Sequence, residues 1–155
     1  MKVALGNDHR GYQAKEIIRD VIRQLGHEVI DCGTDNPGAC DYPDFAYLAA
    51  KEVSEQRADR GILVCATGIG MSMAANKIKG VRAALCHDEL SAQISRDHND
   101  SNVLCLPGDQ VSAMMLGKIV ETWLNTPFSG GRHLRRVQKI AEIEQGHDPR
   151  GVSQS

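Results

Sequence analysis

The stretch LVCATGIGMSMAANK, residues 63–77, decides the fold. An apolar run ends at Cys65, and a threonine and two glycines, Gly68 and Gly70, follow at once. Such a run suits a buried strand, and the glycines suit a tight turn that leads into a helix. The stretch therefore predicts a strand–turn–helix unit with a thiol at the carboxyl end of the strand.

Strand and helix patterns alternate on both sides of this unit. Between residues 11 and 26, for example, apolar residues fall on one helical face and Gly26 ends the pattern. The predicted strands cover residues 2–7, 27–33, 60–66, 80–86 and 102–108, and the predicted helices cover about 11–26, 43–56, 70–78, 88–97 and 111–125. Short apolar strands that alternate with helices are typical of an α/β fold, in which a five-stranded parallel sheet carries helices on both faces.

A last amphipathic segment, at about 130–145, has no strand before it. We expect this C-terminal helix to pack on a partner subunit. With 155 residues, the chain is most simply one domain. We predict a single domain over residues 1–146 and a flexible tail over 147–155.

Composition argues against several classes of function. The chain is 41% apolar and 25% charged, which is ordinary for a soluble globular protein. Its net charge of −2 argues against nucleic acid or an anionic membrane as a partner, because both need a clustered basic face. No apolar run approaches the roughly eighteen residues of a membrane span. We therefore expect neither nucleic acid nor a membrane among the partners.

The five cysteines are odd in number and are never spaced C-x-x-C. This pattern suits reduced thiols, not a disulfide framework or a zinc site. The first residues, MKVALGNDHRGYQAKE, hold too short an apolar stretch for a targeting signal. We therefore expect a cytoplasmic protein.

Polar residues stand near the ends of the predicted strands. In an open α/β sheet, ligands bind beyond the carboxyl ends of the strands. NDH (7–9), DYP (41–43) and CATGIG (65–70) follow the first three strands, and HND (98–100) closes the fourth helix just before the fifth strand. We expect all four stretches to lie on the same edge of the sheet.

The glycine turn allows several interpretations. The third glycine of a dinucleotide fingerprint is replaced by Met73, and the arginine of a C-x5-R phosphatase loop is replaced by Met71. What remains is a turn whose backbone N–H groups suit an anion and the thiolate of Cys65. A lone strand cysteine usually belongs to the core, but Thr67, whose hydroxyl can hydrogen-bond the sulfur, favours a functional thiol.

Three further pairs of residues have both a structural and a functional interpretation. They are Asp8 with His9, His98 with Asn99, and Arg132 with Arg136. The first two pairs could simply cap and end helices. The arginines, four residues apart on one helical face, could be solvated, but a pair of planar guanidinium groups also suits a phosphate monoester.

Six stretches together resemble one family. The chain looks like a type B ribose-5-phosphate isomerase, of the group that also includes galactose-6-phosphate isomerase subunits, over about residues 2–145. The stretches, in order, are GNDHRGYQAK, DYPDFA, RGILVCATGIGMSMAANK, GVRAALCHD, SAQISRDHNDSNVL and GGRHLRRV. The resemblance implies a Rossmann-like three-layer sandwich that works without metal or organic cofactor. It also implies a homodimer, or a dimer of dimers, with sites at the subunit interface.

The resemblance further implies a role for each candidate residue. Aldose–ketose interconversion moves a proton between C1 and C2 through an enediolate, so it needs a base and an oxyanion stabiliser. Cys65 matches the base, Thr67 its hydrogen-bonding partner, and His98 the acid that opens the furanose ring. Ala66, Gly68, Ile69 and Gly70 match the loop around the enediolate oxygens, Asp8, His9, Tyr42 and Asn99 match sugar contacts, and Arg132 and Arg136 match the phosphate clamp.

The sequence departs from the family pattern at a few positions. Ala66 replaces a usual glycine, Asp109 replaces a usual arginine, and Pro107 stands where the family is glycine-rich. We expect isomerisation of ribose 5-phosphate to ribulose 5-phosphate, with a tetrose 4-phosphate or a hexose 6-phosphate as alternative substrates. A non-catalytic sugar-phosphate-binding subunit is the alternative of a different class, and the intact set of Cys65, Thr67 and His98 favours the enzyme.

Overall fold

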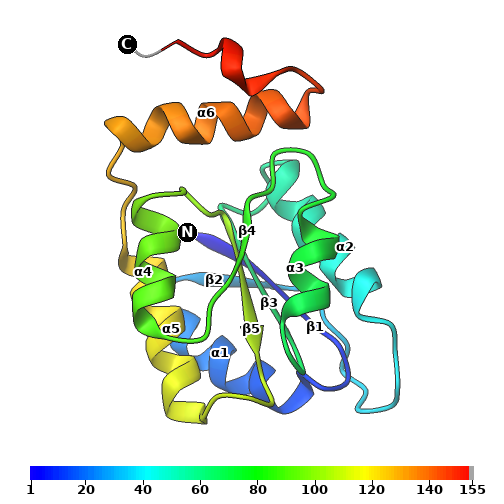
Figure 1. The fold of residues 1–155 in the computed structure, drawn as a ribbon. Coiled ribbons are helices and arrows are strands. Elements are labelled where there is room, and N and C mark those ends of the chain that lie inside the picture. Colours follow the sequence, from blue (N-terminus) through cyan, green and yellow to red (C-terminus); the bar gives the residue numbers. More distant parts are fainter. Residues whose placement is uncertain (154–155) are drawn as a thin grey trace.

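The computed structural model describes residues 1–153, which hold five strands and six α-helices (Figure 1). The strands are β1 (Lys2–Asn7), β2 (Glu28–Asp31), β3 (Arg60–Cys65), β4 (Ala83–Leu85) and β5 (Val103–Pro107). The helices are α1 (Tyr12–Gln24), α2 (Tyr42–Ser54), α3 (Ile69–Ala75), α4 (Glu89–Asp97), α5 (Ala113–Asn125) and α6 (Arg132–Glu144). The predicted order of strands and helices is confirmed.

All neighbouring strands pair in parallel, in the order β2-β1-β3-β5-β4. The edge strands β2 and β4 span only four and three residues, so both are shorter than the sequence predicts. At β4 the cause is local. The Asn102 side chain accepts the N–H of Arg82 at 2.7 Å, and the Asn76 side chain accepts the N–H of Ala83 at 2.9 Å. These side chains therefore bind the backbone N–H groups that a longer β4 would use to pair with a neighbouring strand.

Alternate residues of the central strands face opposite layers of helices, as the pleat of a strand requires. Ile62 and Leu104 pack with Trp123 in the layer of α1, α4 and α5. Leu63 and Cys105 pack in the layer of α2 and α3. Figure 1 shows the two layers on either side of the sheet, which confirms the predicted three-layer α/β sandwich.

Helix α6 stands apart from the two layers. It lies beyond the end of the sheet at which the chain begins (Figure 1), and His133 is its one buried residue. Leu134, Ile140 and Ile143 are 48%, 43% and 59% exposed. Packing of this helix on a partner subunit stays a prediction. The predicted flexible tail, 147–155, includes a short 3₁₀ turn at Pro149–Gly151, and residues 154–155 lie outside the described part of the chain.

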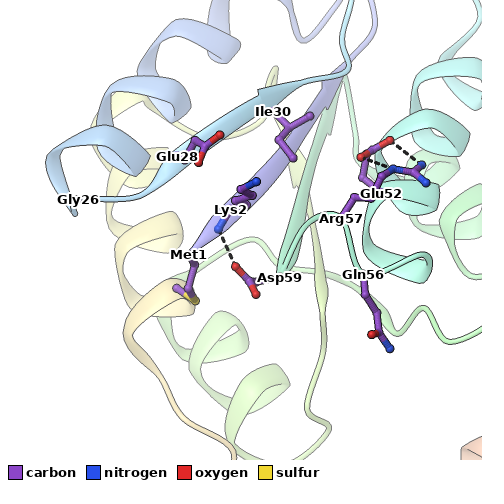
Figure 2. Close-up of a pocket in the computed structure, with 9 residues that line it drawn as sticks. All are labelled: Met1, Lys2, Gly26, Glu28, Ile30, Glu52, Gln56, Arg57 and Asp59. Carbon is purple, nitrogen blue, oxygen red and sulfur yellow. Dashed lines mark hydrogen bonds and ion pairs between the residues drawn. The ribbon is translucent and has the colours of Figure 1, made fainter.

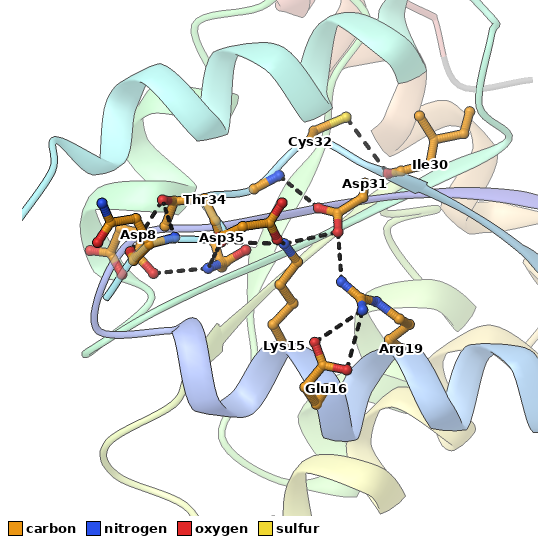
Figure 3. A network of polar contacts seen from close by, with 12 residues as sticks. Asp8, Lys15, Glu16, Arg19, Ile30, Asp31, Cys32, Thr34 and Asp35 are labelled. Carbon is orange, nitrogen blue, oxygen red and sulfur yellow. Dashed lines mark hydrogen bonds and ion pairs between the residues drawn. The ribbon is translucent and has the colours of Figure 1, made fainter. Parts of the chain in front are cut away.

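A buried lysine ties α1 to the segment after β2 (Figure 3). The Lys15 side chain is 1% exposed, and its Nζ lies 2.8 Å from an Asp31 carboxylate oxygen and 2.7 Å from one of Asp35. It also donates a hydrogen bond to the Thr34 carbonyl at 3.2 Å. Burial disfavours the charged lysine, but the hydrogen bonds donated to the two carboxylates raise the pKa of Lys15 overall. The ammonium thus orders the start of the loop that leads to α2.

We expect Lys15→Met to lower the free energy of unfolding by about 1–2 kcal/mol, because the apolar stem stays while the charge-assisted hydrogen bonds are lost. The loss stays modest since Asp31 and Asp35 are partly exposed and regain water. Urea denaturation measures it, with Lys118→Met on the exposed face of α5 as the matched control. Equal losses in the two variants would show that the network adds nothing to stability.

Candidate functional site

Cys65 is the last residue of β3 and is 5% exposed. Its sulfur accepts a hydrogen bond from the Gly68 backbone N–H at 3.1 Å. The Thr67 hydroxyl accepts one from the Ile69 N–H at 3.3 Å. The sulfur is therefore held by the backbone of the turn, whereas the sequence pointed to the Thr67 side chain as its partner.

Two positions after Cys65, Gly68 and Gly70, must lack a side chain, each for its own reason. Gly68 has φ +73°, and a Cβ there would lie 2.5 Å from Leu85 Cδ1 and 3.1 Å from the Leu106 carbonyl oxygen. A Cβ on Gly70 would lie 2.4 Å from Cζ of Tyr42. The turn thus packs against β4 and β5 on one side and against the first residue of α2 on the other.

Asp8 and His9 fix the neighbouring loop after β1. An Asp8 carboxylate oxygen accepts the N–H groups of Arg10 and Gly11, both at 2.9 Å. The predicted helix cap is wrong, because the N-cap of α1 is Gly11, which has no side-chain cap, and Asp8 orders the loop before the helix instead. His9 Nδ1 lies 3.2 Å from both the backbone nitrogen and the carbonyl oxygen of Cys40. A Cβ on Gly11 would lie 2.3 Å from the backbone oxygen next to Cys65, that of Val64.

These contacts bring the first three polar stretches together at the carboxyl edge of the sheet, as the sequence predicts. The expectation for the fourth stretch, HND (98–100), is wrong. His98 and Asn99 precede β5, and the register pairs the start of β5 with Gly61 and its end with Cys65. At about 3.3 Å per residue, the strand separates the two edges by about 13 Å. His98 and Asn99 therefore lie at the opposite edge of their own chain, because a helix that leads into a parallel strand must end there.

A second group of candidate residues gathers at that opposite edge. The His98 ring stacks on the ring of His133 with centroids 4.1 Å apart, and His133 is 8% exposed. Arg132 and Arg136 are exposed on α6, and in the described part of the chain neither makes an ion pair. Sequence reasoning missed His133, although its place beside Arg132 in GGRHLRRV marks it.

Asp100 is a second residue that the sequence did not single out. It has φ +47°, an unfavourable backbone conformation for a residue other than glycine. Its carboxylate accepts hydrogen bonds from Arg82 at 2.9 Å and Arg96 at 2.8 Å. These bonds hold the sharp turn after α4 and so fix the direction of His98 and Asn99.

Several surface hollows lie at this same edge. One of about 470 Å³ lies between α6 and the start of β4 and includes Asn99. Another, an open one of about 800 Å³ (Figure 2), is lined by Met1, Glu28 and Arg57 among others and holds none of the predicted site residues. Within residues 1–153, no cluster of three or more His, Cys, Asp or Glu side chains could hold a metal ion, and no helix is long and apolar enough to cross a membrane.

Burial disfavours the thiolate form of three other cysteines. Burial raises the pKa of Cys86, and burial raises that of Cys105 well above its usual value. Burial also raises the pKa of Cys32 to about 11. A raised pKa makes the thiolate harder to form, and the thiolate is the form that acts as base or nucleophile, so these three cysteines are poor candidates for a catalytic role.

Asp109, where the family usually has arginine, is paired. Its carboxylate accepts a hydrogen bond from Arg10 Nε at 2.8 Å and a second one from Nη2. The Asp109 N–H donates to the Ala66 carbonyl at 3.1 Å, and the Gly108 N–H donates to the Cys65 carbonyl at 2.8 Å. The ion pair therefore sits directly beside the glycine turn.

The family model described as Ribose/Galactose Isomerase matches residues 3–140. The chain belongs to this family. It is 46% identical to ribose-5-phosphate isomerase B of Escherichia coli over 145 residues, which are 93% of this chain and 97% of that protein. The family member described here is thus an enzyme, an aldose–ketose isomerase that acts on sugar phosphates.

Solved structures agree with this assignment. The structure of ribose-5-phosphate isomerase B from Clostridium thermocellum matches with a TM-score of 0.92 and 47% identity, over 94% of this isomerase and 99% of that chain. The crystal structure of the Mycoplasma genitalium enzyme with bound ribulose-5-phosphate matches with a TM-score of 0.90 and 42% identity, over 93% and 96% of the two chains.

The buried imidazole of His133 predicts a pH-dependent stability of the isomerase. Burial, and then the neighbouring His98, lower the pKa of His133 from its usual 6.5. The unfolded chain then binds the proton more readily than the folded one, so stability is complete above pH 6.5 and falls as the pH drops toward the lowered pKa. Urea denaturation across this range should show the decline, and His133→Gln should flatten it. The exposed control His147→Gln should keep it, and an unchanged slope in His133→Gln would contradict the assignment.

Proposed function

We propose that this enzyme converts ribose 5-phosphate to ribulose 5-phosphate through an enediolate, without a cofactor. The observation that carries the proposal is the Cys65 sulfur, held by the Gly68 N–H at the carboxyl edge of the sheet. A thiol in that place can reach a substrate over the glycine turn, where ligands of open α/β sheets bind. The Mycoplasma genitalium relative with bound ribulose-5-phosphate supports the choice of sugar.

In the proposed reaction, the Cys65 thiolate removes the C2 proton of the open-chain aldose and returns it to C1. The electron pair of the broken C2–H bond forms the C1=C2 double bond, and the carbonyl π pair moves onto O1. The proton of the C2 hydroxyl passes to O1, and the enediolate collapses to the ketose as C1 takes the proton back from Cys65. Backbone N–H groups at the start of α3 have no carbonyl partner within the helix and can stabilise the developing oxyanion. Thr67, Ala66 and Ile69 complete the loop around these oxygens.

His98 takes the role of the acid that opens the furanose ring, since the closed sugar has no carbonyl to isomerise. The position of His98 at the opposite edge then requires a second copy of the chain. We propose a homodimer in which Cys65 of one subunit faces His98 and Asn99 of the other. Arg132 and Arg136 of that second subunit bind the phosphate, and Asp8, His9 and Tyr42 contact the sugar. We place the enzyme in the cytoplasm, where its five free cysteines stay reduced.

The substrate is tested with four-, five- and six-carbon aldose phosphates. We expect kcat/KM to be highest for ribose 5-phosphate. Although Asp109 replaces the usual arginine, it pairs with Arg10, so an arginine still lies at the carboxyl edge of the sheet. A higher kcat/KM for a tetrose 4-phosphate would replace ribose 5-phosphate with the shorter sugar. Binding of these sugars without turnover of any would point to a non-catalytic binding subunit and overturn the proposed function.

The shared site is tested with two inactive variants. We expect Cys65→Ala and His98→Asn each to lower kcat by about 10²–10⁴-fold, since each removes a proton-transfer group. When equal amounts are unfolded together and refolded, half the dimers are mixed and each carries one intact site, so about a quarter of wild-type activity should return. The two variants refolded separately are the control. A mixture that stays inactive would show that Cys65 of one subunit and His98 of the other do not form one active site.

A further inference from the structure

Arg10 is the one lysine or arginine in the five loops that follow the strands within residues 1–153. These loops cover residues 8–11, 32–41, 66–68, 86–88 and 108–112. They form the carboxyl edge of the sheet, at which Cys65 lies. An anionic group that approaches the glycine turn therefore meets a single cationic side chain of the same subunit.

The backbone of Arg10 and its guanidinium are each held by an aspartate. Its own backbone N–H donates to Asp8 at 2.9 Å, which anchors the residue at the start of α1. Its Nε donates to Asp109 at 2.8 Å, and Asp109 is tied by its N–H to the Ala66 carbonyl at 3.1 Å. These hydrogen bonds link the loops after β1, β3 and β5 through Arg10 and Asp109.

The pair is nevertheless open to solvent. The Arg10 side chain is 58% exposed and that of Asp109 is 35% exposed. A guanidinium has N–H donors on Nε and both Nη atoms, and Asp109 takes donors only from Nε and Nη2. Nη1 and the second N–H of Nη2 are left for another acceptor. A surface ion pair alone adds little to stability, so stability gives a weak reason for this arrangement.

We propose that Arg10 binds the phosphate group of the sugar phosphate, and that Asp109 is the residue that positions it. This inference rests on the proposed function and adds a binding group from the subunit that carries Cys65. Phosphate oxygens accept the planar, charged donors of arginine well. Because Asp109 already neutralises one positive charge, the contact acts by directed hydrogen bonds more than by long-range attraction.

The test compares Arg10→Gln with Arg23→Gln, which removes the same charge from an exposed site near the end of α1. We expect Arg10→Gln to raise KM for ribose 5-phosphate by about ten- to a hundredfold with kcat changed less than about threefold, as for a lost charge-assisted contact. The inhibition constant of inorganic phosphate should rise with it. Arg23→Gln should leave KM, kcat and the inhibition constant at wild-type values.

The variant Asp109→Asn tests whether Asp109 positions Arg10 or only supports the fold. We expect it to raise KM by less than Arg10→Gln does, and the double variant to match Arg10→Gln, because Asp109 acts only through Arg10. Thermal unfolding identifies any variant that fails to fold. If wild type isomerises ribose 5-phosphate and Arg10→Gln leaves KM and phosphate inhibition unchanged, the inference is wrong while the proposed function stands. A wild type that isomerises no sugar phosphate overturns the proposed function itself.

Discussion

The single direction of the five strands is the constraint on which everything else depends. In a parallel sheet, every loop that follows a strand lies at one edge, and every helix that leads into a strand ends at the other. Cys65 belongs to the first class and His98 to the second, whatever the loops do. No movement of the loops alone can bring the two side chains together across the sheet. A reaction that uses both groups therefore needs two chains, each of which offers opposite edges of the same fold.

The glycine turn shows how packing serves chemistry at the carboxyl edge. Gly68 and Gly70 leave no room for a Cβ because β4, β5 and the Tyr42 ring already occupy that space. The close packing keeps the turn in one conformation, and that conformation aims the Gly68 N–H at the sulfur. Ala66, where the family usually has glycine, is not a disturbance, because its φ is not positive and its carbonyl accepts the Asp109 N–H. Bare backbone is needed at the two glycines and not at Ala66.

The sequence predicts the fold well because apolar periodicity and glycine stops are local signals. It predicts the three stretches at the carboxyl edge for the same reason, since each directly follows a strand. The prediction fails for His98, because the end of a helix was placed at the carboxyl edge of the sheet, where strands end and helices begin. It also fails where the signal is not local: Asp100 is fixed by Arg82 and Arg96, and the Arg10–Asp109 pair joins residues far apart in the chain. Such pairs depend on strand order, which a single sequence does not contain.

Helix α6 carries two features that an isolated chain does not explain. A helix of 13 residues is only marginally stable unless its apolar face is covered, yet Leu134 and Ile143 are about half exposed. Its first turn also holds Arg132, and Arg136 follows one turn later, although a cation in the first turn of a helix opposes the helix dipole and costs about 0.3–1 kcal/mol. A second subunit that covers the apolar face removes the first difficulty. A phosphate held between the two guanidinium groups removes the second, because an anion at that end is favoured by the dipole and by both charges. The dimer that we propose thus also accounts for the exposed face and the charge pattern of α6.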